Sequence, residues 1–259
     1  NHHQCMMEHL KTRTGRLASP FLVEVGFNVG HRPYKVLGKP PVREEDLSPL
    51  PFLKDTNGLR RDLAIFYENI ARMDRAVGDI LRTVEECGRA EETLVVFTMD
   101  HGFAFPRAKA TLYDLGLRTA LRMRWPGGFS GGRVIPTLAG IVGAPLPEDL
   151  DGVSLLPLLR GESATTRSFI FAEKNTSPED LKRGLRTSRF KDIRNANEGP
   201  SLALPADIEV SATRRDMGDV HLVRLRPRVE LYDLRDDPWE QTNLAGREDF
   251  RTIEADQSD

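Results

Sequence analysis

The stretch Leu94-Val-Val-Phe-Thr-Met-Asp-His-Gly102 places an acidic residue and a histidine directly after a short apolar run. Short runs rich in apolar and β-branched residues that end at a turn are typical of buried strands. A second such run, Phe21-Leu-Val-Glu-Val25, is followed within a few residues by His31. Each predicted strand therefore leads into side chains that can carry chemistry: His31 after the first, and Asp100 with His101 after the second.

The strongest helix signal in the chain lies between these two runs. From residue 59 to residue 84, apolar side chains recur every three or four positions, which gathers them on one helical face. Thr56 can cap the start of this helix and Gly88 can end it. The order strand, helix, strand predicts a parallel pair joined by a right-handed crossover, and hence an α/β fold. Because ligands bind beyond the carboxyl ends of strands in open α/β sheets, we expect the side chains that follow the two strands to face one cleft.

Shorter elements are expected in the second half of the chain. The pattern predicts a short helix over 153–159, a strand over 169–172, two strands within 185–193, a loop over 195–220 and a strand over 228–234. This profile is typical of a small antiparallel α+β unit. We therefore expect three regions: a poorly ordered leader over 1–19, part of a mostly parallel α/β domain flanked by helices over 20–165, and a small domain with an antiparallel sheet over 166–259.

The composition is that of an ordinary globular chain. It has 259 residues, of which 39% are hydrophobic and 29% charged, with a formal net charge of -2, so it shows no global preference for nucleic acid. Its apolar runs are far shorter than the roughly 20 residues of a membrane span. Two cysteines imply no disulfide framework. Neither the compartment nor the oligomeric state follows from the sequence, and no secretory signal is present at Asn1.

Four residues form a candidate site for an anionic ester. Asp100 and His101 can ligate a divalent cation, although Asp-His-Gly alone is a common tripeptide. Lys109 can neutralise an oxygen of a tetrahedral anion, or be a solvated surface lysine. His31 can serve as an acid, or as a structural hydrogen bonder. Their order along one predicted half-domain favours the functional interpretation, although no nucleophile accompanies them.

The chain resembles the sulfatase family of the alkaline-phosphatase-like superfamily, and in particular its N-sulfoglucosamine sulfohydrolase-like branch. The resemblance covers about residues 20 to 250. The segments that carry it include Gly26-Phe-Asn-Val-Gly-His-Arg-Pro-Tyr34, Val96-Phe-Thr-Met-Asp-His-Gly102, Phe105-Pro-Arg-Ala-Lys-Ala-Thr-Leu-Tyr113, Leu150-Asp-Gly-Val-Ser-Leu-Leu-Pro-Leu-Leu-Arg-Gly161 and Glu230-Leu-Tyr-Asp-Leu-Arg-Asp-Asp-Pro-Trp-Glu-Gln-Thr-Asn-Leu-Ala245.

This resemblance implies a role for each candidate residue. Asp100 and His101 would be two ligands of one divalent cation, usually calcium in this family. Lys109 would bind a sulfate oxygen and the bridging atom, and His31 would contact the same group and protonate the leaving atom. The implied substrate is a sulfated small molecule or saccharide, and relatives are often exported or lysosomal.

The chain also departs from the family pattern. Sulfatases resembling it use a cysteine in Cys-x-Pro-Ser-Arg, oxidised to formylglycine, as the nucleophile, and two more aspartates complete the metal site. Neither Cys5 nor Cys87 lies in such a motif. We therefore expect an N-terminally incomplete, inactive form that holds calcium weakly. A shortened stretch at 132–140 and the lack of a longer His-containing segment at 173–180 are further departures.

Two alternatives remain open at this stage. A phosphate or phosphonate ester hydrolase of the same superfamily would use the same metal and lysine, because both groups bind either tetrahedral anion. A non-catalytic remnant that binds anions or a partner is the alternative from a different class.

Overall fold

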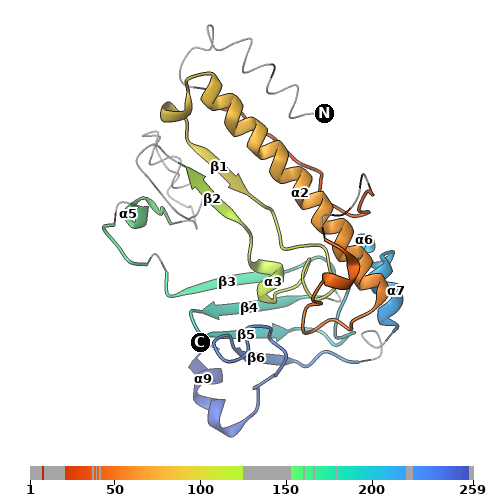
Figure 1. Cartoon of the computed structure of the whole chain (residues 1–259). Helices are drawn as coiled ribbons and strands as arrows, with labels where there is room; N and C mark the ends of the chain where they lie inside the picture. The colour runs from red at the N-terminus through yellow and green to blue at the C-terminus, as the bar shows by residue number, and fades with distance from the viewer. Residues whose placement is uncertain are drawn as a thin grey trace.

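The computed structural model describes Glu8 and residues 21–256, except 37, 39, 41, 125–152, 160, 166, 179 and 220–223. This part of the chain contains one long helix, a two-stranded sheet and a four-stranded sheet, with short helices between them (Figure 1). The predicted leader, apart from Glu8, and the predicted shortening at 132–140 lie outside the described residues.

The long helix α2 (Asn57–Glu86) confirms the strongest prediction from the sequence. The side chain of Thr56 caps it by accepting a hydrogen bond from the Leu59 N–H at 3.1 Å. Just beyond its end Gly88 has a φ of 67°, a conformation that glycine adopts without strain. The apolar face of α2 packs on the first hydrophobic cluster, which joins Leu47, Leu53, Leu59, Leu63, Ala64 and Phe105. None of the described helices combines the length and apolar composition of a membrane span.

The two-stranded sheet corrects the predicted parallel arrangement. Strand β1 (Val95–Thr98) pairs antiparallel with β2 (Leu121–Arg124), and all strand pairs among the described residues are antiparallel. Residues 21–28 form no strand, and the Leu22 side chain is 92% exposed. None of the residues from Phe21 to Val25 is buried in the structure. β1 pairs instead with the run that returns after the intervening loop, which is the connection that antiparallel strands allow.

The four-stranded sheet confirms the strands predicted in the second half. It consists of β3 (Phe169–Lys174), β4 (Lys182–Thr187), β5 (Phe190–Asn195) and β6 (Val229–Asp233), hydrogen-bonded in that order. Its inner strand β5 is buried, and a second hydrophobic cluster forms where Leu112 packs against Ile193 and Tyr232.

The loop predicted over 195–220 is wrong in part. It contains α6 (Ala206–Glu209) and α7 (Ala212–Met217), and α7 packs on α2 near its first turn (Figure 1). There the Gly58 N–H donates to Asp216 Oδ2 at 2.7 Å. Helices of four and six residues are too short to leave a periodic apolar pattern, which is why they were missed. The domain boundary near residue 165 stays a prediction.

The remaining described helices are short. The predicted helix at 153–159 is confirmed as α5. The bounds of these short helices are Glu44–Asp46 for η1, Ala90–Glu92 for η2, Asp114–Leu117 for α3, Leu156–Leu159 for α5, Glu248–Phe250 for η3 and Arg251–Asp256 for α9.

Candidate functional site

Lys109 lies in the loop that connects β1 to α3. Its backbone N–H donates to the Phe103 carbonyl at 3.2 Å. The flanking residues Arg107 and Ala110 have φ angles of 64° and 61°, a left-handed conformation that residues with a β-carbon adopt only where the surroundings impose it. The loop around Lys109 is therefore held in a specific shape by contacts elsewhere.

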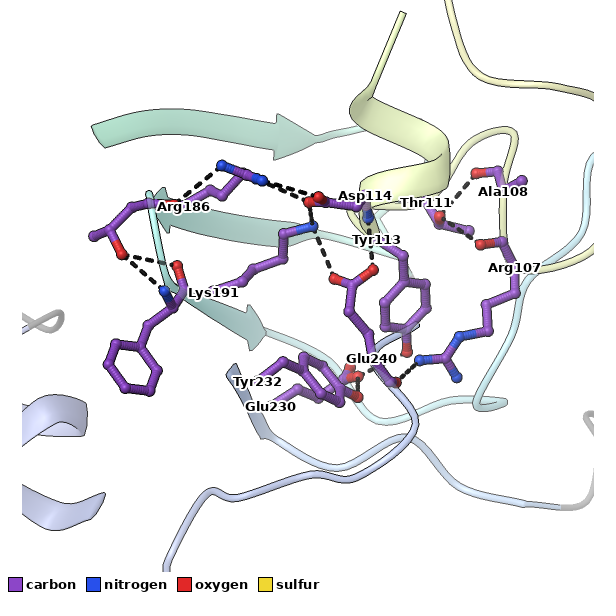
Figure 2. A network of polar contacts seen from close by, with 12 residues as sticks. Arg107, Ala108, Thr111, Tyr113, Asp114, Arg186, Lys191, Glu230, Tyr232 and Glu240 are labelled. Atoms are coloured by element: carbon purple, nitrogen blue, oxygen red, sulfur yellow. Dashed lines mark hydrogen bonds and ion pairs between the residues drawn. The ribbon is translucent and has the colours of Figure 1, made fainter. Parts of the chain in front are cut away.

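A buried polar network fixes the end of this loop to the four-stranded sheet (Figure 2). The Asp114 carboxylate accepts hydrogen bonds from Arg186 at 2.9 and 3.0 Å and from the Lys191 ammonium. The Asp114 N–H donates to Glu240 Oε2 at 2.7 Å, and Lys191 lies 2.8 Å from Glu240 Oε1. Burial acts to raise the pKa of Asp114, but the hydrogen bonds from Arg186 and Lys191 outweigh it and hold the pKa below its usual value. Asp114 therefore binds the sheet as an ion.

A second group of contacts holds Arg107, which precedes Lys109, and Tyr113, which follows it (Figure 2). The Arg107 guanidinium donates to the Glu240 carbonyl and lies 3.9 Å from the centre of the Tyr113 ring. The hydroxyls of Tyr113 and Tyr232 each donate to Glu230 Oε2 at 2.7 Å. Burial is the largest cause that raises the pKa of both tyrosines, so both stay protonated donors. Together with Asp114, these contacts fix both sides of Lys109.

The Lys109 ammonium is paired with a carboxylate from α6. Lys109 Nζ lies 2.7 Å from Asp207 Oδ2, and their side chains are only 15% and 16% exposed. Burial acts to raise the pKa of Asp207, but the hydrogen bond and charge of Lys109, with a smaller contribution from His31, lower it overall. Of the four predicted site residues, Lys109 thus pairs directly with this carboxylate, and the charge of His31 also acts on it.

His31 is positioned through its neighbour Arg32. The His31 ring Nδ1 lies 2.5 Å from the Arg32 carbonyl oxygen. The Arg32 side chain is buried, and its Nε donates to the Ala104 carbonyl at 2.6 Å. Its guanidinium carbon lies 4.2 Å from the centre of the Tyr34 ring and 4.7 Å from that of Phe105. Because Ala104 belongs to the Lys109 loop, Arg32 fixes His31 relative to Lys109.

Asp62 on α2 completes this arrangement. Its Oδ2 accepts from Arg32 Nη1 at 3.0 Å, from the Thr213 N–H at 3.0 Å and from the Thr213 hydroxyl at 2.7 Å. Thr213 belongs to α7, which directly follows the helix that carries Asp207. Asp62 therefore joins the segment of His31 to α7, and its partner Arg32 joins that segment to the loop of Lys109.

Asp100 and His101 follow the end of β1, as predicted, but their side chains are accessible to solvent. The Asp100 side chain is 88% exposed, and its Oδ2 lies 3.6 Å from His101 Nε2. No group of three His, Cys, Asp or Glu side chains that could hold a metal occurs in the described part of the chain. Calcium takes six to eight oxygen ligands, so these two donors alone do not fit that ion. Nor does a described contact join them to Lys109 or Asp207.

Sequence reasoning missed Arg32, Asp62 and Asp207 as site residues. One usable signal was Asp62 itself, an acidic residue one position before Leu63 on the buried face of a helix, because buried carboxylates need partners. Asp207 had no comparable signal, since it lies in a four-residue helix. Its proximity to Lys109 is created by the tertiary fold.

Comparisons with known proteins add a family context. The family model described as Sulfatase matches residues 4–142. An ulvan-active sulfatase of Formosa agariphila is 31% identical over 226 residues, which are 78% of this chain and 37% of that protein. The human N-sulphoglucosamine sulphohydrolase is 29% identical over 231 residues, or 75% of this chain and 45% of that protein.

Among solved structures, the fold of this chain matches that of a sulfatase whose description concerns the metabolism of multiple glycosaminoglycans by Bacteroides thetaiotaomicron. The TM-score is 0.72 and the sequence identity is 19%. The match covers 98% of this chain and 56% of that one. This likeness shows the alkaline-phosphatase-like sulfatase fold. The chain spans less than half the length of the two curated relatives, and their similar identities do not single out one branch of the family.

Proposed function

Because the chain belongs to the sulfatase family, we propose that it provides part of a site that hydrolyses sulfate esters or N-sulfates of sugars. The observation that carries the proposal is that the segment of His31 is joined to the loop of Lys109, since Arg32 Nε donates to the Ala104 carbonyl at 2.6 Å, while Lys109 itself pairs with Asp207. The names of two relatives support a sugar substrate, since one is an ulvan-active sulfatase and the other an N-sulphoglucosamine sulphohydrolase.

Lys109 is the sulfate-binding group in this proposal. Its side chain is only 15% exposed, so its ammonium is largely shielded from water. A fixed positive charge in such surroundings stabilises the charge that builds up on sulfuryl oxygens during transfer. One well-placed interaction of this kind is worth roughly 3 kcal/mol in the transition state.

His31 is the proposed proton donor to the leaving atom. Its Nδ1 lies 2.5 Å from the Arg32 carbonyl, an acceptor, so Nδ1 carries a hydrogen. The other ring nitrogen, Nε2, is then the one that transfers a proton to the substrate when the imidazole is protonated. A general acid must lie within hydrogen-bond reach of the atom it protonates, and the hydrogen bond that joins the neighbouring Arg32 to the loop of Lys109 supports that role.

Lys109 and His31 supply neither a full set of metal ligands nor a nucleophile. Sulfatases typically use calcium, and we propose that Asp100 and His101 contribute one carboxylate and one imidazole to it. Cys5 and Cys87 are the cysteines of the sequence, and neither lies in Cys-x-Pro-Ser-Arg. We therefore expect these 259 residues alone to have no sulfatase turnover.

Binding of inorganic sulfate to the purified chain tests the proposal. In a nitrogen-15 NMR titration with sodium sulfate against sodium chloride of equal ionic strength, the backbone signals of Lys109 and His31 should shift with sulfate alone. Lys109→Ala should abolish the response, whereas Lys54→Ala, on the exposed surface, should keep it. A sulfate response that survives Lys109→Ala, or no response at all, would contradict the proposed role of Lys109.

Turnover provides the second arm of the test. The chain should not hydrolyse 4-nitrophenyl sulfate in the presence of calcium. Calcium-dependent turnover that Lys109→Ala abolishes would show that these residues are active alone, and would contradict the expected lack of turnover.

A further inference from the structure

A carboxylate beside an anion-binding lysine requires a physical explanation. Asp207 Oδ2 lies 2.7 Å from the nitrogen of Lys109, so a sulfate held by Lys109 would come within a few ångström of the Asp207 charge. Like charges repel more strongly at such distances when water is largely excluded, and both side chains are mostly buried. Asp207 therefore weakens the binding of a bare anion, unless the substrate brings a group that the carboxylate attracts.

We propose that Asp207 determines substrate specificity by accepting a hydrogen bond from a hydroxyl or ammonium group that the sugar carries near its sulfate. This inference rests on the proposed function, because it assigns the sulfate to Lys109. It adds to that function the kind of group, a hydroxyl or an ammonium, that the sugar presents to the site beside its sulfate.

The neighbours of Asp207 indicate which part of the substrate it meets. His31, the proposed proton donor, is close enough for its charge to act on Asp207, and the atom that His31 protonates belongs to the sugar. The Tyr34 hydroxyl donates to the Ala104 carbonyl of the Lys109 loop at 3.3 Å, and burial, with a smaller contribution from the charge of Asp207, raises the pKa of Tyr34. We place the carboxylate on the leaving-group side because its partner Lys109 lies in the loop whose Ala104 carbonyl accepts from Arg32, the neighbour of His31.

The carboxylate still has capacity for a ligand. An ionised carboxylate offers about four acceptor positions, and Lys109 occupies one of them at Oδ2. Within the described residues, no side-chain donor other than Lys109 forms a hydrogen bond to Asp207. The side chain is 16% exposed, so a ligand can reach it.

Asp207 is also held in place, as a specificity-determining group must be. The adjacent Ile208 is fully buried, and α6 leads directly into α7. On α7, Thr213 donates two hydrogen bonds to Asp62 of α2. The carboxylate is therefore presented to the site by a fixed element.

Asp207→Asn tests the inference, because it removes the charge and keeps the shape and one acceptor oxygen. The probes are inorganic sulfate and 4-nitrophenyl sulfate, which have no neighbouring donor, and glucose and glucosamine, each sulfated at position 3 or 6. NMR titration of the whole chain gives each affinity. A hydrogen bond to a charged group is worth about 1.5–3 kcal/mol, so the variant should bind the best sugar sulfate at least about tenfold more weakly. Inorganic sulfate and 4-nitrophenyl sulfate should bind as tightly as before, or more tightly.

The glucose and glucosamine probes distinguish the two possible donors. A loss for both sugars indicates a hydroxyl, and a loss confined to glucosamine indicates the ammonium. Glu209→Gln is the matched control, since it makes the same chemical change on the same helix at a side chain that pairs with Arg214. It should leave all affinities unchanged.

Two outcomes would overturn the inference. Equal affinities of Asp207→Asn and wild type for every sugar sulfate would remove Asp207 from recognition. A uniform tightening for all probes would make it a counter-ion of Lys109 only. In either case, sulfate binding that still depends on Lys109 would leave the proposed function intact.

A measurement on the wild-type chain keeps the test valid if Asp207→Asn fails to fold. The wild type should bind at least one of the four sugar sulfates about tenfold more tightly than 4-nitrophenyl sulfate. No preference for any of the sugars would overturn the inference without a variant.

Discussion

Arg32 and Asp62 determine where the candidate site residues lie, although neither is expected to touch a substrate. Arg32 follows His31, donates to the loop of Lys109 and pairs with Asp62 at 3.0 Å. Asp62 in turn accepts two hydrogen bonds from α7. Both side chains are at most 10% exposed. The geometry of the site therefore depends on one buried ion pair.

Asp62→Asn should strongly destabilise the chain. The variant leaves the Arg32 charge buried without its carboxylate, and removing one partner of a buried pair costs about 3–5 kcal/mol. Urea denaturation followed by circular dichroism measures the loss in the free energy of unfolding. Asp79→Asn is the control, because Asp79 pairs with Arg82 on the exposed surface of the same helix, where such pairs contribute about 0.5 kcal/mol. If Asp62→Asn and Asp79→Asn lowered the free energy of unfolding by amounts within about 1 kcal/mol of each other, the buried pair would contribute no more than an exposed one.

At this scale the sequence predicted the residues of a motif but not their partners. His31, Asp100, His101 and Lys109 stand in short segments that can be read directly from the chain. Asp62 and Asp207 are recognisable only through residues that are distant in sequence and close in the fold. A carboxylate has no local pattern that indicates which distant cation it will meet.

At the scale of elements, the loop that carries Lys109 closes around two glycines. A β-carbon on Gly116 would lie 2.5 Å from the carbonyl oxygens of both Ala108 and Thr111, and one on Gly102 would lie 1.7 Å from the Leu115 carbonyl oxygen. Neither distance is tolerated between non-bonded atoms. Both positions therefore require glycine because of close backbone approach.

Gly116→Ala should destabilise the chain by about 1–3 kcal/mol, the usual cost of overpacking. It should also move the NMR signal of Lys109, since the displaced carbonyl of Ala108 precedes it directly. Gly78→Ala is a control of opposite sign: it lies inside α2, where a β-carbon meets nothing within 4 Å. Alanine is favoured over glycine in a helix by up to about 1 kcal/mol, so this variant should be more stable. If Gly116→Ala proved as stable as wild type, the loop would be less tightly packed than the structure indicates.

The hydrogen bonds that join α3 to the sheet predict a dependence on pH. Burial acts to raise the pKa of Asp114, but Arg186 and Lys191 lower it overall. A carboxyl whose pKa is lower in the folded state stabilises that state fully above its unfolded pKa of about 3.9. The contribution is lost as pH falls through the folded pKa. The free energy of unfolding of wild type should therefore decrease from about pH 5 downward, and less steeply for Asp114→Asn. Equal slopes would show that Asp114 is not ionised against these cations.

The elements differ in how much of them the sequence determines locally. Helix α2 has 30 residues, repeats its apolar pattern from Leu59 to Val84 and carries a cap at each end, so both its existence and its ends were predictable. The partner of β1 was not, because a short apolar run has the same pattern in a parallel and an antiparallel pair. Tertiary packing decided that β1 pairs with β2 and that Phe21 to Val25 stays outside the sheet.

At the scale of the whole molecule, the Lys109 loop connects the two hydrophobic clusters. Phe105 belongs to the cluster beneath α2, whereas Leu112 packs against Ile193 and Tyr232 in the cluster on the four-stranded sheet. Lys109 lies between these two anchors in the chain. A substitution that loosens either hydrophobic cluster should therefore change the position of the Lys109 ammonium group.

Arg107→Ala tests this connection. The variant removes the hydrogen bond to the Glu240 carbonyl and the stacking on Tyr113, contacts worth about 1–3 kcal/mol together. Hydrogen exchange should become faster in the Lys109 loop and also in β6, because Tyr113 and Tyr232 share Glu230. The far end of α2 should keep its protection. Arg235→Ala, which removes an exposed pair with Asp236, should leave exchange unchanged in the loop. Faster exchange confined to the loop would mean that the loop does not transmit the change to the sheet, and that the two clusters are energetically independent.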